Sequence, residues 1–181
     1  EHRHFLVGLR SMRRLIHAVG QAISLRMKPL VDLFIASNGQ PLTLNGRVIS
    51  QMDRIPLQSG IVRVVFLNPR PSLGGLALKT TKGSIKMSDG RSVRLLHIWD
   101  DPNFSRQAEH QAECSDGELR VWNIYRTHHP DGSISVDSWT GNAGMIIELV
   151  SPNCRRYWCS HGSGDFDPTD MIVEVNWTVS H

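Results

Sequence analysis

The chain has 181 residues, 40% of them hydrophobic and 20% charged, and a formal net charge of +3. This composition argues against an intrinsically disordered chain, and the length fits one medium-sized domain or two small ones, of which we expect two. The charge is uneven, because residues 1–75 have ten Lys and Arg against three Asp and Glu, whereas residues 76–181 have ten against fourteen. The basic residues of the first part are scattered, so we expect a solvated surface and no nucleic-acid partner.

The cysteine content and the hydrophobic pattern indicate the cellular compartment in which the protein is expected. Three cysteines cannot all pair with one another, which fits a reducing compartment or a metal site better than a secreted disulfide framework. No apolar run reaches the roughly 20 residues that span a bilayer, and no signal-peptide pattern opens the sequence. We therefore expect an intracellular protein, cytoplasmic or nuclear, that does not insert into a membrane.

The first predicted elements are a strand at Phe5–Leu9 and a helix that Ser11 caps and Pro29 ends. Apolar residues recur at helical spacing and predict a buried stripe along this helix. A strand at Leu33–Ala36, a polar turn, a short return strand at Leu42–Ser50 and a final alternating strand complete this part. The stripe consists of Met12, Leu15, Ile16, Val19, Ile23 and Met27.

The order and identity of several residues after this helix resemble those of ubiquitin. The resemblance covers about residues 5–67 and implies a β-grasp domain at residues 1–67 that lacks its first strand. It also implies a partner-binding surface at Phe34 and Val65, with Arg63 on the same strand as Val65. The alternative is that Phe34 packs beneath a second domain. The matching residues are Leu33-Phe34-Ile35-Ala36, Leu42, Asn45-Gly46-Arg47-Val48-Ile49, Ile55, Gln58 and Val62-Arg63-Val64-Val65.

Proline and glycine residues at 68–76 predict a flexible linker between two domains. The segment Leu73-Gly74-Gly75 is similar to the Gly-Gly tail of ubiquitin. A weaker hypothesis is therefore a ubiquitin-like precursor that a protease cleaves after Gly75.

Residues 77–181 show alternation of apolar and polar residues between Asp-Gly turns at 89–90, 116–117 and 131–132. The segment Met171–Val179, for example, places its apolar residues on one face of a strand. The pattern predicts an all-β antiparallel domain, either a sandwich or a flattened barrel. Together with the ubiquitin-like half, the expected fold class is α+β.

Cysteine and histidine lie close together in two predicted loops. Thiolate and imidazole are the ligands that zinc prefers, and two loops with two ligands each can form a structural site. If zinc is bound, we expect Cys114, Cys154, Cys159 and His161 as ligands, with His110 as the alternate ligand. The alternative is that these are unrelated buried or surface residues.

The loop at residues 160–170 combines a histidine with three aspartates, which would suit cation binding or acid–base chemistry. A solvated connector is the alternative. The metal-dependent hydrolase that this loop suggests would use Cys154, Cys159, His161, Asp165 and Asp167.

Five tryptophans are numerous for residues 77–181. Aromatic residues usually fill the core of a β-domain, but a surface row beside His97, Tyr125 and Arg126 would bind carbohydrate or peptide. The tryptophans are Trp99, Trp122, Trp139, Trp158 and Trp177.

Our leading hypothesis for function is a non-enzymatic protein-interaction protein. In this hypothesis the ubiquitin-like half binds a protein partner and the β-domain contributes a second recognition surface. The alternatives are the metal-dependent hydrolase and the precursor processed after Gly75. No cofactor is expected except zinc at the site described above.

Overall fold

A computed structural model describes residues 28–69, 71–72, 74–103 and 105–180. The predicted strand at Phe5–Leu9 and the predicted helix after it lie outside these residues. The described chain begins with helix α2 (Leu30–Ala36), followed by a hairpin of β1 (Leu42–Leu44) and β2 (Arg47–Ile49).

The segment Leu33–Ala36 is part of helix α2, so the strand expected there is wrong. Pro29 occupies the N-cap position, and the helix ends where the Gly39 N–H donates to the Phe34 carbonyl at 2.8 Å. A short apolar run cannot by itself distinguish a strand from a helix, and here the flanking Pro and Gly mark helix ends.

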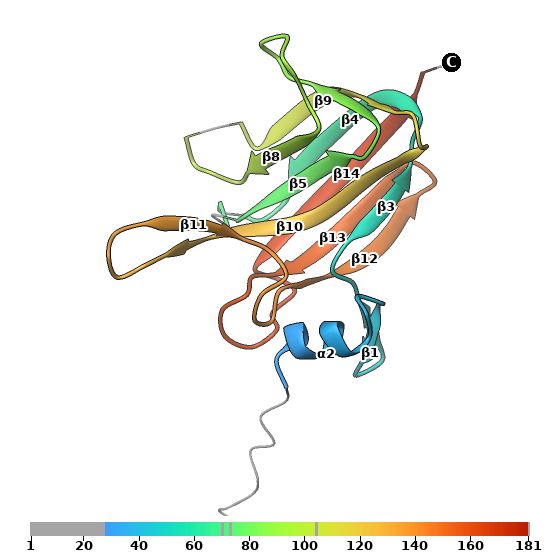
Figure 1. Ribbon diagram of the computed structural model, residues 1–181. Coiled ribbons are helices and arrows are strands. Elements are labelled where there is room, and N and C mark those ends of the chain that lie inside the picture. Colours follow the sequence, from blue (N-terminus) through green and yellow to red (C-terminus); the bar gives the residue numbers. More distant parts are fainter. Residues whose placement is uncertain (1–27, 70, 73, 104, 181) are drawn as a thin grey trace, which may run out of the picture.

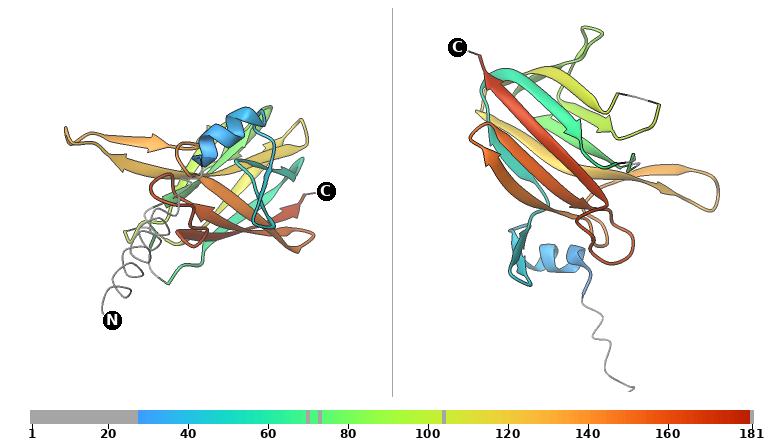
Figure 2. Two further views of the ribbon diagram at one scale, coloured as in Figure 1. Left: turned by 90° about the horizontal axis from the view of Figure 1, so that it is seen from below. Right: turned by 180° about the vertical axis from the view of Figure 1, so that it is seen from behind.

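The rest of the described chain folds into two antiparallel sheets packed face to face (Figures 1 and 2). The front sheet consists of β3 (Asp53–Pro56), β5 (Gly74–Thr80), β8 (Leu95–Trp99), β10 (Glu118–His128) and β11 (Ile134–Asp137). The back sheet consists of β4 (Ser59–Phe66), β6 (Gly83–Lys86), β7 (Ser92–Val93), β9 (Gln107–Cys114), β12 (Gly144–Ser151), β13 (Cys154–Ser160) and β14 (Met171–Val179).

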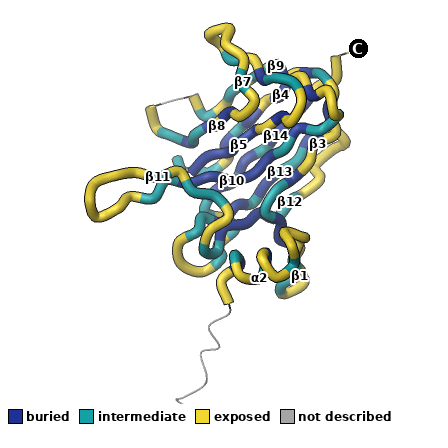
Figure 3. The backbone as a smooth tube through the Cα atoms, in the orientation of Figure 1, coloured by how far each residue is buried: buried dark blue, intermediate teal, exposed yellow. Residues whose placement is uncertain are grey.

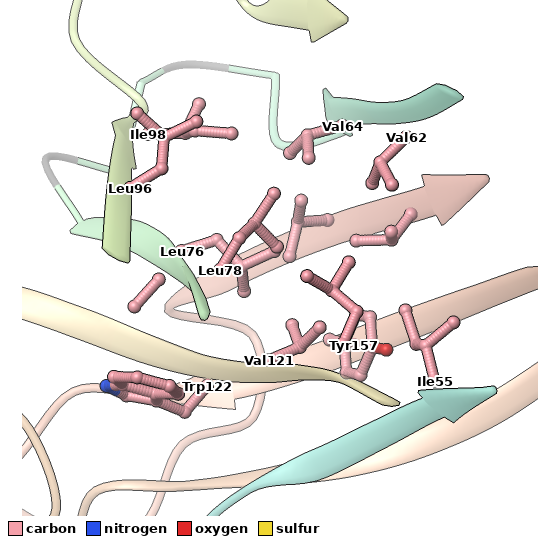
Figure 4. Close-up of a cluster of buried hydrophobic side chains, with 14 of the residues drawn as sticks. Ile55, Val62, Val64, Leu76, Leu78, Leu96, Ile98, Val121, Trp122 and Tyr157 are labelled. Atoms are coloured by element: carbon pink, nitrogen blue, oxygen red, sulfur yellow. The ribbon is translucent and has the colours of Figure 1, made fainter. Parts of the chain in front are cut away.

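The main core lies between the two sheets, where much of each central strand is buried (Figures 3 and 4). Leu76, Leu78 and Val121 of the front sheet meet Val62 and Val64 of the back sheet, and all five are fully buried. Alternation along the strands directs these side chains inward, so the neighbouring residues point away from the core. The two packed antiparallel sheets agree with the sandwich alternative predicted for residues 77–181, but they also include β3 and β4. Within the described residues neither sheet closes into a barrel.

A smaller apolar cluster joins α2 and the β1–β2 hairpin to one end of the sandwich. Leu30, Phe34 and Ile49 are buried together against Ile146 of β12 and Phe166. The backbone groups of Ser50 and Met145 also pair directly, at 2.8 Å in both directions. Helix α2 therefore packs at the end of the sandwich, and no described helix covers the outer face of the front sheet (Figure 1).

A ubiquitin-like N-terminal domain is not confirmed. The alternating strand assigned to it, β4, lies inside the back sheet between β14 and β9, both of which come after residue 76. Strand β3 likewise pairs with β10 in the front sheet. The two-domain expectation differs from this arrangement because sequence pattern alone does not reveal which distant strands supply the hydrogen bonds of β3 and β4.

The expected linker at residues 68–76 contains the beginning of strand β5. Gly74 and Gly75 are buried in this strand, where a Cβ atom on Gly75 would lie 2.7 Å from the Ile98 carbonyl oxygen. These glycines allow close packing of β5 against its neighbours, which explains their presence without a processing site.

Candidate ligand-binding surface

The outer face of the back sheet carries two arginines with carboxylate partners. Arg156 donates hydrogen bonds to Glu174 at 2.6 Å and to Glu148 at 3.4 Å. Arg63 of β4 lies 3.6 Å from Glu109 of β9. These two arginines are therefore neutralised by residues of the same sheet.

The outer face of the front sheet is aromatic. His97 of β8, Ala77 of β5 and Trp122 of β10 are directly opposite one another, so their side chains share this face. Figure 4 shows Val121 and Trp122 on opposite sides of the β10 ribbon. Trp99 lies beside His97 with ring centroids 6.3 Å apart.

Exposed apolar residues extend this face. Trp139 packs on Trp122 with ring centroids 5.4 Å apart and remains 38% exposed. Leu95 of β8 is 43% exposed, and Val136 and Ile134 of β11 are 50% and 56% exposed. We call this surface the aromatic face; it comprises Leu95, His97, Trp99, Trp122, Ile134, Val136 and Trp139. Trp122 is only 7% exposed beneath Trp139, so the exposed part of this face consists mainly of the aliphatic side chains and Trp139. Exposed apolar side chains that gather on one face often mark an interaction site.

A row of cations crosses the aromatic face. Arg120 of β10 lies directly opposite Lys79 of β5 on one side and Arg54 of β3 on the other. Arg54 pairs with Glu118 at 3.2 Å, but no described residue forms an ion pair with Lys79 or Arg120. The buried Arg120 Nε also has no hydrogen-bond partner among the described residues. Like charges directly opposite one another destabilise a sheet, so the row favours an anionic ligand.

Arg126 is held in place on the same face. Its guanidinium lies 4.2 Å from the centroid of the Trp99 ring, and its Nη1 donates to Asp101 at 3.4 Å. Asp101 also accepts hydrogen bonds from Asn103, and these bonds lower the pKa of its carboxyl group. Burial beside Trp99 lowers the pKa of His97, which favours the neutral imidazole.

The residues that the ubiquitin resemblance selected are not brought together. Phe34 is only 1% exposed in the small cluster around α2, which agrees with the alternative that it packs against the rest of the chain. Val65 lies on the outer face of the back sheet, where its strand neighbour Arg63 hydrogen-bonds Gln107 at 2.7 Å.

The structure does not assemble the expected zinc ligands. Cys114 lies in β9 and is buried, whereas Cys154 and Cys159 lie at the two ends of β13, about 16 Å apart for an extended strand. Among the described residues no group of three or more His, Cys, Asp or Glu could hold a metal ion. Burial raises the pKa of all three thiols, which disfavours the thiolate that zinc requires. His110 instead contacts the Lys86 carbonyl at 3.3 Å.

The residues of the 160–170 loop mainly hold the loop itself. Asp170 accepts from the His161 backbone N–H at 2.9 Å, and Asp167 accepts from Thr169 at 2.7 and 2.8 Å. The His161 ring stacks on Tyr125, and burial lowers the pKa of His161. Its buried Nε2 has no hydrogen-bond partner among the described residues. Asp165 is exposed.

The tryptophans divide between the two roles expected of them. Trp177 is buried in the main core, and Trp158 lies on the back sheet, where its Nε1 donates to Glu148 at 3.1 Å. Trp99, Trp122 and Trp139 lie on the aromatic face with His97 and Arg126. Tyr125, which was also expected there, points inward and contacts Thr140. Four further residues of this face could not be predicted from the sequence, because only the pairing of β5, β8, β10 and β11 brings them together: Lys79, Arg120, Leu95 and Val136.

A groove of about 1300 Å³ also lies between α2, the β1–β2 hairpin and the loop near Phe166. Leu30, Leu33 and Phe166 give it an apolar lining, and Lys28 lies at the point where the described chain begins. Nothing in its lining indicates a particular ligand.

Comparisons with known proteins identify no relative: no protein-family model, curated protein or solved structure matches the chain. Within the part of the chain that the structure describes, no helix has both the length and the apolar character needed to cross a membrane.

Proposed function

We propose that this protein is a non-enzymatic recognition domain that binds a segment of a protein partner on the aromatic face. The observation that carries the proposal is the contrast between the two outer faces of the sandwich. On the back sheet Arg63 and Arg156 pair with carboxylates, whereas the front sheet exposes aliphatic side chains and Trp139 beside two cations, Lys79 and Arg120, that form no ion pair with a described residue.

The contacts among the aromatic rings favour a peptide over a carbohydrate. A sugar stacks on an open ring face, but Arg126 covers one face of Trp99, and Trp122 and Trp139 cover each other. Protein interfaces, in contrast, combine tryptophan and arginine with surrounding aliphatic side chains, as this face does. No catalytic role is proposed, because the polar groups of the 160–170 loop hold its turns.

A pair of matched variants tests the proposal. Leu95 is 43% exposed on the aromatic face and Ile61 is 49% exposed on the back sheet, so Leu95→Asp and Ile61→Asp make the same kind of change on opposite faces. Peptides selected by the full chain from a displayed random library would be synthesised and titrated by calorimetry. We expect Leu95→Asp to weaken binding about tenfold or more, equivalent to about 1.4 kcal/mol, and Ile61→Asp to have little effect.

Two results would contradict the proposal. One is equal binding of the selected peptides by both variants and the wild type. The other is the absence of any selected peptide together with binding on a glycan array that Leu95→Asp abolishes, which would assign the aromatic face to carbohydrate.

A further inference from the structure

We infer that the partner is an acidic peptide segment in extended conformation, which adds to the front sheet as a new strand beside β8. This inference rests on the proposed function and specifies how the aromatic face would be used. Strand β8 is the edge of the front sheet, because its order runs β11, β10, β5, β8 (Figure 1).

The register of β8 shows which of its backbone groups are available. Thr80 N–H donates to Arg94 O at 3.0 Å, and Asp100 N–H donates to Gly74 O at 2.9 Å. Hydrogen-bonded pairs alternate with non-bonded pairs in an antiparallel ladder, so Leu96 and Ile98 also bond to β5. The N–H and C=O groups of Leu95, His97 and Trp99 therefore point away from β5, toward the free edge.

The sequence of β8 lacks the residues that usually protect an edge strand against strand addition. Leu95–Trp99 contains no proline, no charged residue and no glycine. No described residue outside the sheet ladders donates to or accepts from the backbone of Leu95, His97 or Trp99. By comparison, the edge strand β12 is irregular near Leu149 and is bridged at Met145 by Ser50. Strand β8 therefore offers an edge to which a further strand could add.

The edge is continuous with the aromatic face. The side chains of Leu95, His97 and Trp99 lie on that face, and they belong to the residues whose backbone groups point outward. Residues directly opposite in a ladder share a face, so every second side chain of an added strand would extend the aromatic face. Backbone bonds would supply affinity and these alternate side chains specificity.

The positive charges near the edge indicate which side chains the added strand should carry. Lys79 is exposed and lies directly opposite Leu95, one strand in from the edge, and Arg120 follows in the next strand. A carboxylate on the added strand opposite Leu95 would be within reach of the Lys79 ammonium and would offset the repulsion between Lys79 and Arg120. Sequences with alternating acidic residues therefore fit this edge, whereas alternating basic residues do not.

Two substitutions of His97 distinguish the contribution of its backbone N–H to binding from that of its side chain. Because the His97 N–H points away from β5, His97→Pro removes an outward donor without removing a bond of the sheet. His97→Ala is the matched control, since it removes the ring but keeps the donor. The probes are capped peptides of about eight residues, an ordinary strand length, that alternate valine with either glutamate or lysine.

We expect the wild-type chain to bind the Val-Glu peptide and not the Val-Lys peptide. Binding should protect the amides of Leu95, His97 and Trp99 from hydrogen exchange, as followed by NMR. His97→Pro should weaken binding about tenfold or more, while His97→Ala should have a smaller effect. Lys79→Glu should reverse the preference between the two peptides.

Several results would overturn the inference. If Leu95→Asp weakens binding but the three amides stay unprotected, the aromatic face binds its ligand without strand addition, and the proposed function survives alone. If neither Leu95→Asp nor His97→Pro changes binding, both fail. If sedimentation shows a dimer that His97→Pro dissociates, the edge serves a second copy of the chain. The exchange measurement uses wild-type protein, so it decides the question even if His97→Pro does not fold.

Discussion

Reversing the charge of Lys79 should stabilise the free protein. Lys79 lies directly opposite Arg120, which in turn lies opposite Arg54, so three cations follow one another across three strands. Arg54 has Glu118 as a partner, whereas Lys79 and Arg120 have no ion pair with a described residue. Lys79→Glu would replace a repulsive cross-strand pair with an attractive one.

The expected gain in stability is the sum of two electrostatic contributions. Removing a like-charge pair and adding an opposite-charge pair each change stability by about 0.2–1 kcal/mol at such positions. We therefore expect a gain of about 1 kcal/mol in the free energy of unfolding, which corresponds to about 2–4 °C in Tm for a domain of this size. Lys79→Gln, which only removes the repulsion, should give about half of this gain.

Urea denaturation at low and high salt measures the effect, because salt screens exposed charges. Lys86→Glu is the matched control: Lys86 is also an exposed strand lysine, but it lies opposite the uncharged Ser92 and Gln111. A gain that is equal for Lys79→Glu and Lys86→Glu would reflect net charge alone. That result, or a loss of stability in Lys79→Glu, would refute the account of the cation row.

Three further predictions concern the sandwich itself. Gly60→Ala should destabilise the fold by about 2 kcal/mol or more by chemical denaturation, because a Cβ there would collide with the Thr178 backbone carbonyl; unchanged stability would contradict the β4–β14 pairing. Burial lowers the pKa of His161 in the folded protein. As the pH falls, the imidazole is therefore protonated in the unfolded chain before it is protonated in the folded protein, and the free energy of unfolding should decrease below about pH 6.5. His161→Gln should reduce that fall, and an identical pH profile would count against the burial. The three buried cysteines should react with a thiol reagent only after denaturation, and rapid native labelling would contradict their placement.

The sequence predicted the strands of the second half well because alternation and turn residues are local signals. Met171–Val179 is strand β14 over its full predicted length, and the strand predicted after Ser115-Asp116-Gly117 is β10. Gly90, Gly117 and Gly132 have positive φ, as the predicted Asp-Gly turns require.

The structure of the first half was harder to predict from the sequence, because its local patterns are compatible with two different structures. Asn45-Gly46 forms a tight hairpin turn, with φ of 50° and 74°, between β1 and β2. In the resemblance to ubiquitin, Asn45 and Gly46 instead matched an Asp-Gly pair of ubiquitin. The pairings that determine the fold join β3 to β10 and β4 to β14. These strands are far apart in the sequence, and a single sequence does not show which distant strands pair.

The candidate surface was only partly predictable for the same reason. Tryptophan, His97 and Arg126 were expected on a binding platform from residue type alone. The position of Lys79 opposite Arg120, and of Leu95 at the sheet edge, depends on register between strands that are distant in the chain. The zinc hypothesis failed on geometry, since spacing along the sequence does not reveal that Cys154 and Cys159 lie at opposite ends of one strand.

The position of β4 has a consequence for how the protein is made. Strand β4 ends at Phe66, whereas its neighbour β14 begins at Met171, so about a hundred residues must be translated in between, which takes about 5–20 s. During that interval the nascent chain exposes an apolar strand, Ile61–Phe66, with one side unpaired. A ribosome-bound chain at this stage should therefore be a client of chaperones that cover hydrophobic segments, and premature termination before β14 should yield insoluble product.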